Sequence, residues 1–133
     1  STLVIGGKGH MKESFEEFTE ILGLEENVEF EGFIPEEKLQ SYYHIADVFV
    51  SPSINEPFGL TISEALSCGT KVVCTESGIN ELLPSDLVTV VEPNSDSITE
   101  GLEKSLEKDL GDFEDRSWEE MIEDYLEIYR GLV

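Results

Sequence analysis

The chain has 133 residues, 39% of them hydrophobic, which suits one domain with a sizeable core. Eight Lys and Arg against thirty Asp and Glu give a net charge of −22. Nucleic-acid backbones and anionic membranes attract clustered Lys and Arg, so this charge argues against both as partners. No apolar run reaches the ~20 residues of a membrane span and no signal peptide opens the sequence, so we expect a cytoplasmic domain.

The first half of the chain alternates short apolar runs with amphipathic segments. In chain order it predicts a strand over Thr2–Ile5, a helix over Met11–Leu22, a strand over Asn27–Phe30, a helix opened by Pro35, and a strand over Asp47–Val50. The helix over 11–22 carries Phe15, Phe18 and Leu22 on one face. The inner face of the helix after Pro35 is predicted to hold Leu39, Tyr42, Tyr43 and Ala46.

The second half continues the same alternation. It predicts a helix over Gly59–Cys68, a strand over Lys71–Cys74, a short helix over Asn80–Leu83, a strand over Leu87–Val91, and two helices over Ser97–Leu110 and Ser117–Arg130. Acidic residues are concentrated from Glu92 to Glu127, which we interpret as a solvated helical face.

Strands that alternate with helices predict one α/β domain over residues 1–133. The strands are nearly continuous apolar runs, as expected for a parallel sheet covered by helices on both faces. Ligands of such sheets bind beyond the carboxyl ends of the strands. The candidate site therefore lies in the loops that follow the strands, at residues 6–10, 31–35, 51–60, 75–80 and 92–94.

The segment from Ser51 to Glu64 carries the most information about function. A strand ends, a loop holds Glu56, and Gly59 opens a helix that holds Glu64. Exposed N–H groups at a helix N-terminus suit an anionic or polyhydroxyl ligand, and carboxylates accept hydrogen bonds from sugar hydroxyls. The alternative is that Glu56 caps the helix and Glu64 is a surface acid, since the chain holds 23 Glu residues.

Cysteine and histidine residues offer no metal site in this sequence. Cys68 and Cys74 lie in apolar segments and do not form a C-x-x-C pair, so we expect buried thiols in a reducing compartment. His10 and His44 are far apart and lack the spacing of metal ligands. An unrelated doubly wound signalling domain is disfavoured, because its phosphorylatable Asp would end a strand whereas Asp47 begins one.

An ordered set of motifs resembles one known family. The segment Glu56-Pro-Phe-Gly-Leu-x-x-x-Glu64 is similar to the E-x7-E motif of retaining family-4 glycosyltransferases. Further landmarks follow the family's order: Leu3–Gly9, Asn27–Gly32, Tyr42–Ser53, Glu64–Gly69, Lys71–Val73, and a tail with Ser117-Trp118 and Tyr129-Arg130. The resemblance covers nearly the whole chain. It implies the C-terminal, Rossmann-like half of a GT-B enzyme, which binds the nucleotide-sugar donor.

The resemblance also implies roles for individual residues. Glu56 would contact the donor hexose as the catalytic candidate, and Glu64 would contact the ribose hydroxyls. The remaining donor-binding candidates are the backbone N–H groups of Phe58, Gly59 and Leu60 at the sugar and diphosphate, Glu31 and Phe33 beside the base, and Gly6 and Gly7 where the chain passes the nucleotide. The implied reaction is hexose transfer with retention from a nucleoside-diphosphate sugar, without a metal or another cofactor. The base, the sugar and the acceptor stay open.

The chain departs from the family pattern at its start. The family holds an Arg and a Lys against the diphosphate on an earlier strand–loop–helix unit, and it binds the acceptor with an N-terminal domain; neither is found in this sequence. In the strand order 3-2-1-4-5-6, the missing first strand would lie between the strands at Leu3 and Val48. We therefore expect little or no transferase activity from these 133 residues alone. The full-length enzyme would be cytoplasmic or peripheral to the inner face of the membrane. The alternative is a non-catalytic subunit or binding module that pairs with a separate N-terminal chain.

Overall fold

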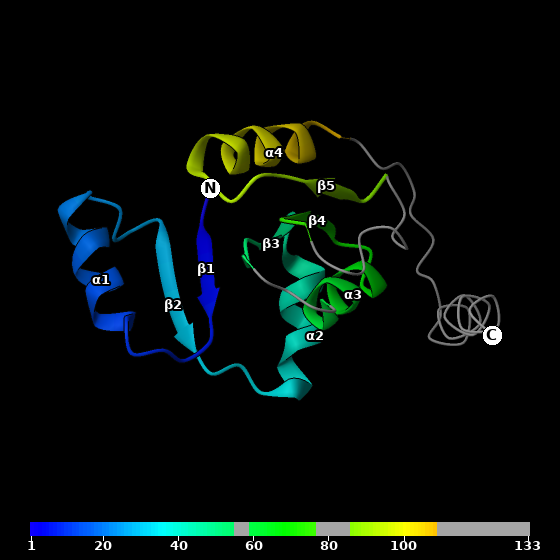
Figure 1. Cartoon of the computed structure of the whole chain (residues 1–133). Helices are drawn as coiled ribbons and strands as arrows, with labels where there is room; N and C mark the ends of the chain where they lie inside the picture. Colours follow the sequence, from blue (N-terminus) through cyan, green and yellow to red (C-terminus); the bar gives the residue numbers. More distant parts are fainter. Residues whose placement is uncertain (55–58, 77–85, 109–133) are drawn as a thin grey trace. The chain divides into compact units, whose positions relative to one another are not determined.

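The described part of the chain divides into two compact units. The structure, a computed structural model, describes residues 1–54, 59–76 and 86–108. The first unit is Ser1–Leu39, and the second begins at Gln40 (Figure 1). The helices predicted at Asn80–Leu83 and Ser117–Arg130 lie outside the described residues.

The first unit contains a parallel pair of strands and one helix. Strand β1 (Leu3–Gly6) is followed by helix α1 (Lys12–Ile21) and strand β2 (Val28–Gly32). The two strands pair in parallel from Leu3 opposite Val28, and the register shifts after Ile5 so that Gly6 lies opposite Gly32. Gly32 has a φ of 66°, which only glycine adopts without strain, and this turn ends β2.

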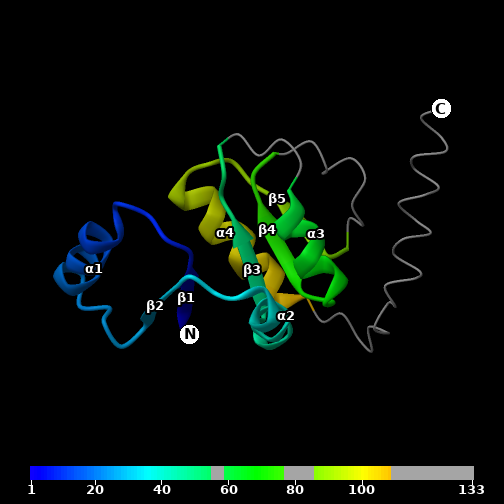
Figure 2. The same cartoon turned by 90° about the horizontal axis from the view of Figure 1, so that it is seen from below.

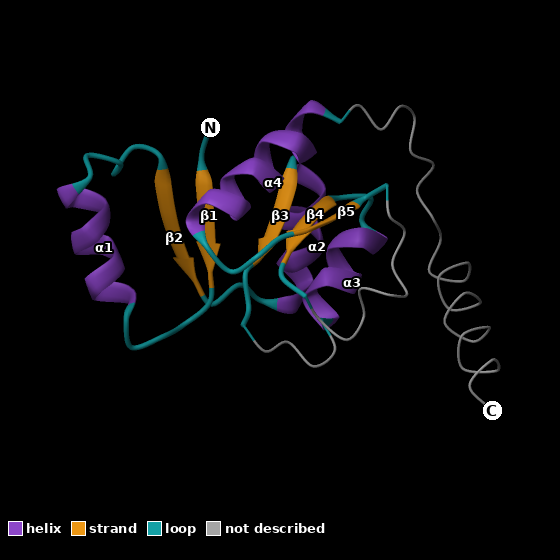
Figure 3. Cartoon of the chain, turned by 45° about the horizontal axis from the view of Figure 1, so that its top comes forward, coloured by secondary structure: helices purple, strands orange, loops and turns teal. Residues whose placement is uncertain are grey.

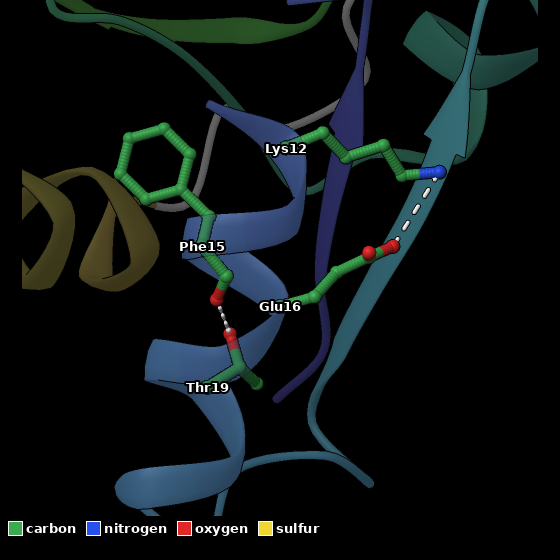
Figure 4. A network of polar contacts seen from close by, with 4 residues as sticks. All are labelled: Lys12, Phe15, Glu16 and Thr19. Carbon is green, nitrogen blue, oxygen red and sulfur yellow. Dashed lines mark hydrogen bonds and ion pairs between the residues drawn. The ribbon is translucent and has the colours of Figure 1, made fainter. Parts of the chain in front are cut away.

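Helix α1 forms where its pattern predicts, but its apolar face is exposed. Phe15 and Phe18 are about half exposed, and no residue of α1 is buried. A two-stranded ribbon with one flanking helix offers little surface for burying these side chains. The polar side of the helix carries an ion pair between Lys12 Nζ and Glu16 Oε1 at 3.4 Å, and the Thr19 hydroxyl donates to the Phe15 carbonyl at 2.8 Å (Figure 4). Such a surface pair adds at most about 1 kcal/mol.

The second unit contains a three-stranded parallel sheet. Helix α2 (Glu36–Ile45) enters it from the first unit and is followed by β3 (Val48–Ser51), α3 (Leu60–Ser67), β4 (Lys71–Cys74), β5 (Val88–Val90) and α4 (Ser95–Glu107). The strand order is β3-β4-β5, with Val48 opposite Lys71 and Val72 opposite Val88. Helices cover both faces of this sheet, with α4 on one side and α3 on the other (Figures 1 and 3).

The core of the described chain lies in the second unit. Its most buried apolar side chains come from α2, α3, β4, β5 and the residue just before β5, and they are Tyr43, Ile62, Ala65, Val72, Val73, Cys74, Leu87 and Val88. The central strand β4 is sandwiched between α3 and α4 (Figure 2), which explains why its sequence is a continuous apolar run. Every buried side-chain nitrogen and oxygen atom in the described residues has a hydrogen-bond partner.

Helix α4 begins two residues earlier than the sequence predicts. Its apolar pattern indicates a start at Ser97, whereas the structure begins it at Ser95 after the cap residue Asn94. The Asn94 side chain accepts a hydrogen bond from the Ser97 backbone N–H at 2.9 Å, which satisfies one of the unpaired donors of the first turn. The capping asparagine therefore sets the start of the helix.

Strands β1 and β3 belong to different sheets. The described strands form a pair β1-β2 and a triplet β3-β4-β5, and no pairing joins β1 to β3. One domain is predicted over residues 1–133, and the division into two units falls between the two sheets.

Candidate functional site

Loops at the carboxyl ends of β3, β4 and β5 lie along one edge of the three-stranded sheet, because the strands are parallel. The buried Thr75, just after β4, donates through its backbone N–H to the Ser51 carbonyl at 3.2 Å and through its hydroxyl to the Ser53 carbonyl. The Val91 N–H donates to the Cys74 carbonyl at 2.8 Å. These bonds tie the strand ends together and fix where the loops after β3 and β4 leave the sheet.

Helix α3 begins at this edge, at a glycine that the backbone requires. Gly59 is buried, has a φ of 78° and precedes the first helical residue, Leu60. Any other residue would be strained in this left-handed conformation. Among the described residues no side chain caps the helix, and the Gly59 carbonyl accepts from the Ser63 N–H at 3.1 Å. The first N–H groups of an α-helix have no partner within the helix, so those of α3 from Leu60 onward can donate to a ligand, as the resemblance implies for Leu60.

Glu64 lies on the same helix and meets a tyrosine from α2. Its side chain is exposed, while Ile62 and Ala65 of α3 are buried in the core. The hydroxyl of Tyr43 donates a hydrogen bond to Glu64 Oε2 at 3.0 Å. Glu64 is thus exposed on the surface, as the alternative of a surface acid expects. Its carboxylate, however, accepts a hydrogen bond from the buried Tyr43.

Tyr43 is fixed by contacts on its ring and its backbone. Only 6% of the residue is exposed, and its ring meets the Phe49 ring edge-on with centroids 5.3 Å apart. Its carbonyl accepts from the Thr70 hydroxyl at 2.7 Å and from the Ala46 N–H at 3.2 Å. Burial, followed by the hydrogen bond to the Glu64 carboxylate, raises the pKa of the Tyr43 hydroxyl. The phenol therefore keeps its proton and acts as a donor throughout the neutral pH range.

The first unit holds the other predicted donor loops. Gly7 has a φ of 120° and donates through its N–H to the Gly32 carbonyl at 2.6 Å, which joins the loops after β1 and β2. A Cβ on Gly6 would lie 2.7 Å from Ile34 Cδ1, so Gly6 permits a close packing contact. The Lys8 ammonium lies 5.3 Å from the centre of the Phe33 ring, within the range of a cation–π contact.

The predicted site residues fall into two groups. Gly6, Gly7 and Phe33 come together in the first unit, where Glu31 is exposed one residue before the Gly32 turn. Gly59, Leu60 and Glu64 lie together on α3 in the second unit. Glu56 and Phe58 lie outside the described residues.

The cysteines and the metal-ligand types add two findings. Cys74 is completely buried, whereas Cys68 is only half-buried at the end of α3, because it follows the last turn of the helix. Residues 1–54, 59–76 and 86–108 contain no group of three or more His, Cys, Asp or Glu side chains that could hold a metal ion. None of the helices in these ranges has both the length and the apolar character needed to cross a membrane.

Comparison with known proteins decides the family. The sequence profile of the "Glycosyl transferases group 1" family matches residues 1–123. The chain belongs to this glycosyltransferase family. The uncharacterized glycosyltransferase MJ1607 of Methanocaldococcus jannaschii is 32% identical over 96% of the chain, and the chain spans 36% of that protein.

Several solved structures share the fold of the chain. Sucrose-phosphate synthase from Thermosynechococcus elongatus matches 79% of the chain at a TM-score of 0.69 and 31% identity, and the match covers 28% of that protein. HepE of Anabaena, solved in complex with UDP, matches 78% of the chain at a TM-score of 0.61 and 26% identity, covering 32% of that protein. The predicted Rossmann-like α/β architecture of a GT-B glycosyltransferase is confirmed. The chain spans about a third of these relatives' length.

Sequence reasoning missed the contact between Tyr43 and Glu64. It predicts that Tyr43 faces inward from α2, which the structure confirms, but it assigns the hydroxyl no partner. A signal was present, because a buried tyrosine hydroxyl normally has a hydrogen-bond partner. The partner is 21 residues away on another helix, so only the packing of α2 and α3 identifies it.

Proposed function

We propose that this glycosyltransferase-family chain is the donor-binding part of a retaining family-4 enzyme. The enzyme transfers a hexose from a nucleoside-diphosphate sugar to an acceptor. In this reaction the bond between the anomeric carbon and the diphosphate oxygen breaks, and an acceptor oxygen bonds to the same face of the sugar. The acceptor's proton leaves, and the nucleoside diphosphate is released. In this proposal Glu56 contacts the hexose of the donor, and Glu64 contacts the ribose hydroxyls.

The main observation behind this proposal is the exposed position of Glu64 near the start of α3. Glu64 is the second glutamate of the E-x7-E motif, it is exposed, and it lies five residues beyond the glycine that begins α3. The first turn of α3 offers N–H donors for sugar or phosphate oxygens, while the carboxylate offers acceptors for hydroxyls. A nucleoside-diphosphate sugar carries both kinds of group. The UDP complex of HepE supports a nucleoside diphosphate as the ligand class.

The charge of the chain predicts weak donor binding by these residues alone. A diphosphate is an anion, and the chain carries a net charge of −22. In the second unit Lys71 and Lys108 lie away from α3's start: Lys71 Nζ donates to the Lys108 carbonyl at 3.1 Å, and Lys108 Nζ to the Asp86 carbonyl at 3.5 Å. We therefore propose that efficient transfer also needs cations and an acceptor domain from additional polypeptide. Such transfer would proceed in the cytoplasm without a bound metal.

The proposed site is tested by ligand-observed NMR on the 133-residue chain with UDP, GDP and ADP. We expect one of the three to bind in the millimolar range and Glu64→Gln to weaken that binding about tenfold, because hydrogen bonds to a charged acceptor are lost. Glu103→Gln, on the exposed side of α4, removes the same charge elsewhere and should leave binding unchanged. Wild-type affinity in Glu64→Gln would refute the site, and robust transferase activity of the 133 residues alone would refute their dependence on additional polypeptide.

A further inference from the structure

We propose that Tyr43 is a positioning residue for Glu64 and that it sets the preference of the site for ribose over 2′-deoxyribose. The inference rests on the proposed function, in which Glu64 contacts the ribose hydroxyls of the donor. The contact that motivates it is the hydrogen bond from the Tyr43 hydroxyl to Glu64 Oε2. Tyr43 does not itself touch the ligand in this proposal, since it acts through the carboxylate.

Tyr43 is suited to this role because it is a rigid donor. The edge-on contact with Phe49 holds its ring, and the Thr70 hydroxyl holds its carbonyl. The residue is nearly completely buried, so little water competes for its hydroxyl. The Tyr43 hydroxyl therefore has a fixed position, and its hydrogen bond orients the Glu64 carboxylate.

Glu64 is suited to being positioned because it would otherwise be mobile. A glutamate on an exposed helix face loses considerable rotamer freedom when a ligand fixes it. Among the described residues, Tyr43 is the hydrogen-bond partner of its carboxylate, and it occupies Oε2. The other oxygen, Oε1, then faces a defined direction and is left to accept from ligand hydroxyls.

A positioned carboxylate discriminates more strongly than a mobile one. A ribose supplies adjacent 2′ and 3′ hydroxyl donors, whereas a 2′-deoxyribose lacks one of them. A fixed acceptor that loses its donor cannot readily turn to water, so the missing hydroxyl reduces affinity more than it would at a mobile side chain. Removal of the Tyr43 hydroxyl should therefore lower the ratio of affinities for the ribo- and 2′-deoxyribo-forms of the nucleotide.

The experiment measures this ratio by NMR on the 133-residue chain, with the best-binding nucleoside diphosphate and its 2′-deoxy analogue. We expect Tyr43→Phe to lower the ratio about fivefold, mainly by weakening binding of the ribonucleotide. Thr89→Val is the matched control, because it removes a partly buried hydroxyl that bonds Ser105 at 3.1 Å in the same unit, away from α2 and α3. This control should leave the ratio unchanged.

The outcomes separate this inference from the proposed function. If the chain binds no nucleotide, or if Glu64→Gln leaves the ratio unchanged, the proposed function fails at its site. If Glu64→Gln lowers the ratio and Tyr43→Phe does not, or if Tyr43→Phe weakens both nucleotides equally, the positioning role is refuted. If Tyr43→Phe does not fold, Phe49→Leu replaces it: loss of the edge-on ring contact loosens the Tyr43 hydroxyl without altering Glu64 and should lower the ratio, and an unchanged ratio refutes the role.

Discussion

Gly101 of α4 provides a quantitative test of how the second unit packs. The residue is buried, and a Cβ placed on it would lie 2.5 Å from Val91 Cγ1 and 3.2 Å from Val73 Cγ1. Val73 is completely buried in β4 and cannot move aside. Val91 is half-buried, but its branched side chain has few alternative rotamers. Gly101→Ala should therefore force apart the helix and the sheet.

Two effects of opposite sign set the size of the change. Alanine is favoured over glycine inside a helix by about 1 kcal/mol. Overpacking a filled core costs about 1–3 kcal/mol. The contact at 2.5 Å is severe enough that overpacking should win, so we expect Gly101→Ala to lower the free energy of unfolding by about 1 kcal/mol.

Urea denaturation followed by circular dichroism measures this change. Val91→Ala provides a second background for the comparison, because it removes the methyl group that the new Cβ would meet. In the Val91→Ala background, Gly101→Ala should be neutral or stabilising, which gives a coupling energy of about 1–2 kcal/mol between the two sites. Stabilisation by Gly101→Ala in the wild-type chain, or additivity of the two substitutions, would refute the packing described for α4.

Three further predictions concern titration, salt and thiol chemistry. The pKa of Tyr43 is raised above its ordinary value of 10.0, so its contribution to stability is complete below pH 10 and is lost as the pH rises beyond it. The free energy of unfolding should therefore fall more steeply above pH 10 in the wild type than in Tyr43→Phe; equal slopes would contradict this. Nucleoside diphosphate affinity should rise between low and moderate salt, since salt screens the repulsion from a chain of net charge −22, and a falling affinity would show that a local cation dominates. In the folded chain a thiol reagent should modify the half-buried Cys68 well before the buried Cys74, because burial also raises the pKa of the Cys74 thiol. Equal rates of modification would contradict the burial described for the two cysteines.

Much of the fold follows from local sequence patterns. The strands form within about two residues of their apolar runs, because those runs are too short for helices and end at turn-forming residues. The strand over Lys71–Cys74 is reproduced residue for residue. The start of α4 differs because Asn94 caps the helix, and a side-chain cap is not part of an apolar pattern. The exposure of Phe15 and Phe18 also escapes such patterns, which identify an apolar face without identifying what covers it.

The candidate site is only partly readable from the sequence. Gly59 was expected to open a helix and does so in the left-handed conformation that makes glycine necessary there. Glu64 is exposed on that helix, as the alternative of a surface acid expects. The Tyr43 partner does not, because it depends on how two helices pack around Phe49 and Thr70. Long-range side-chain contacts of this kind are set by tertiary packing, which local periodicity does not encode.

The most direct test of a donor site at α3 is a map of backbone amide shifts in the 133-residue chain during titration with nucleoside diphosphates. We expect the largest shift changes in the second unit to fall between Gly59 and Glu64, since N–H groups of that first turn and the carboxylate bind the ligand. We also expect small changes along Glu103–Glu107 of α4, which lies on the opposite face of the sheet. Saturable binding whose shift changes avoid residues 59–64 would contradict a donor site at α3.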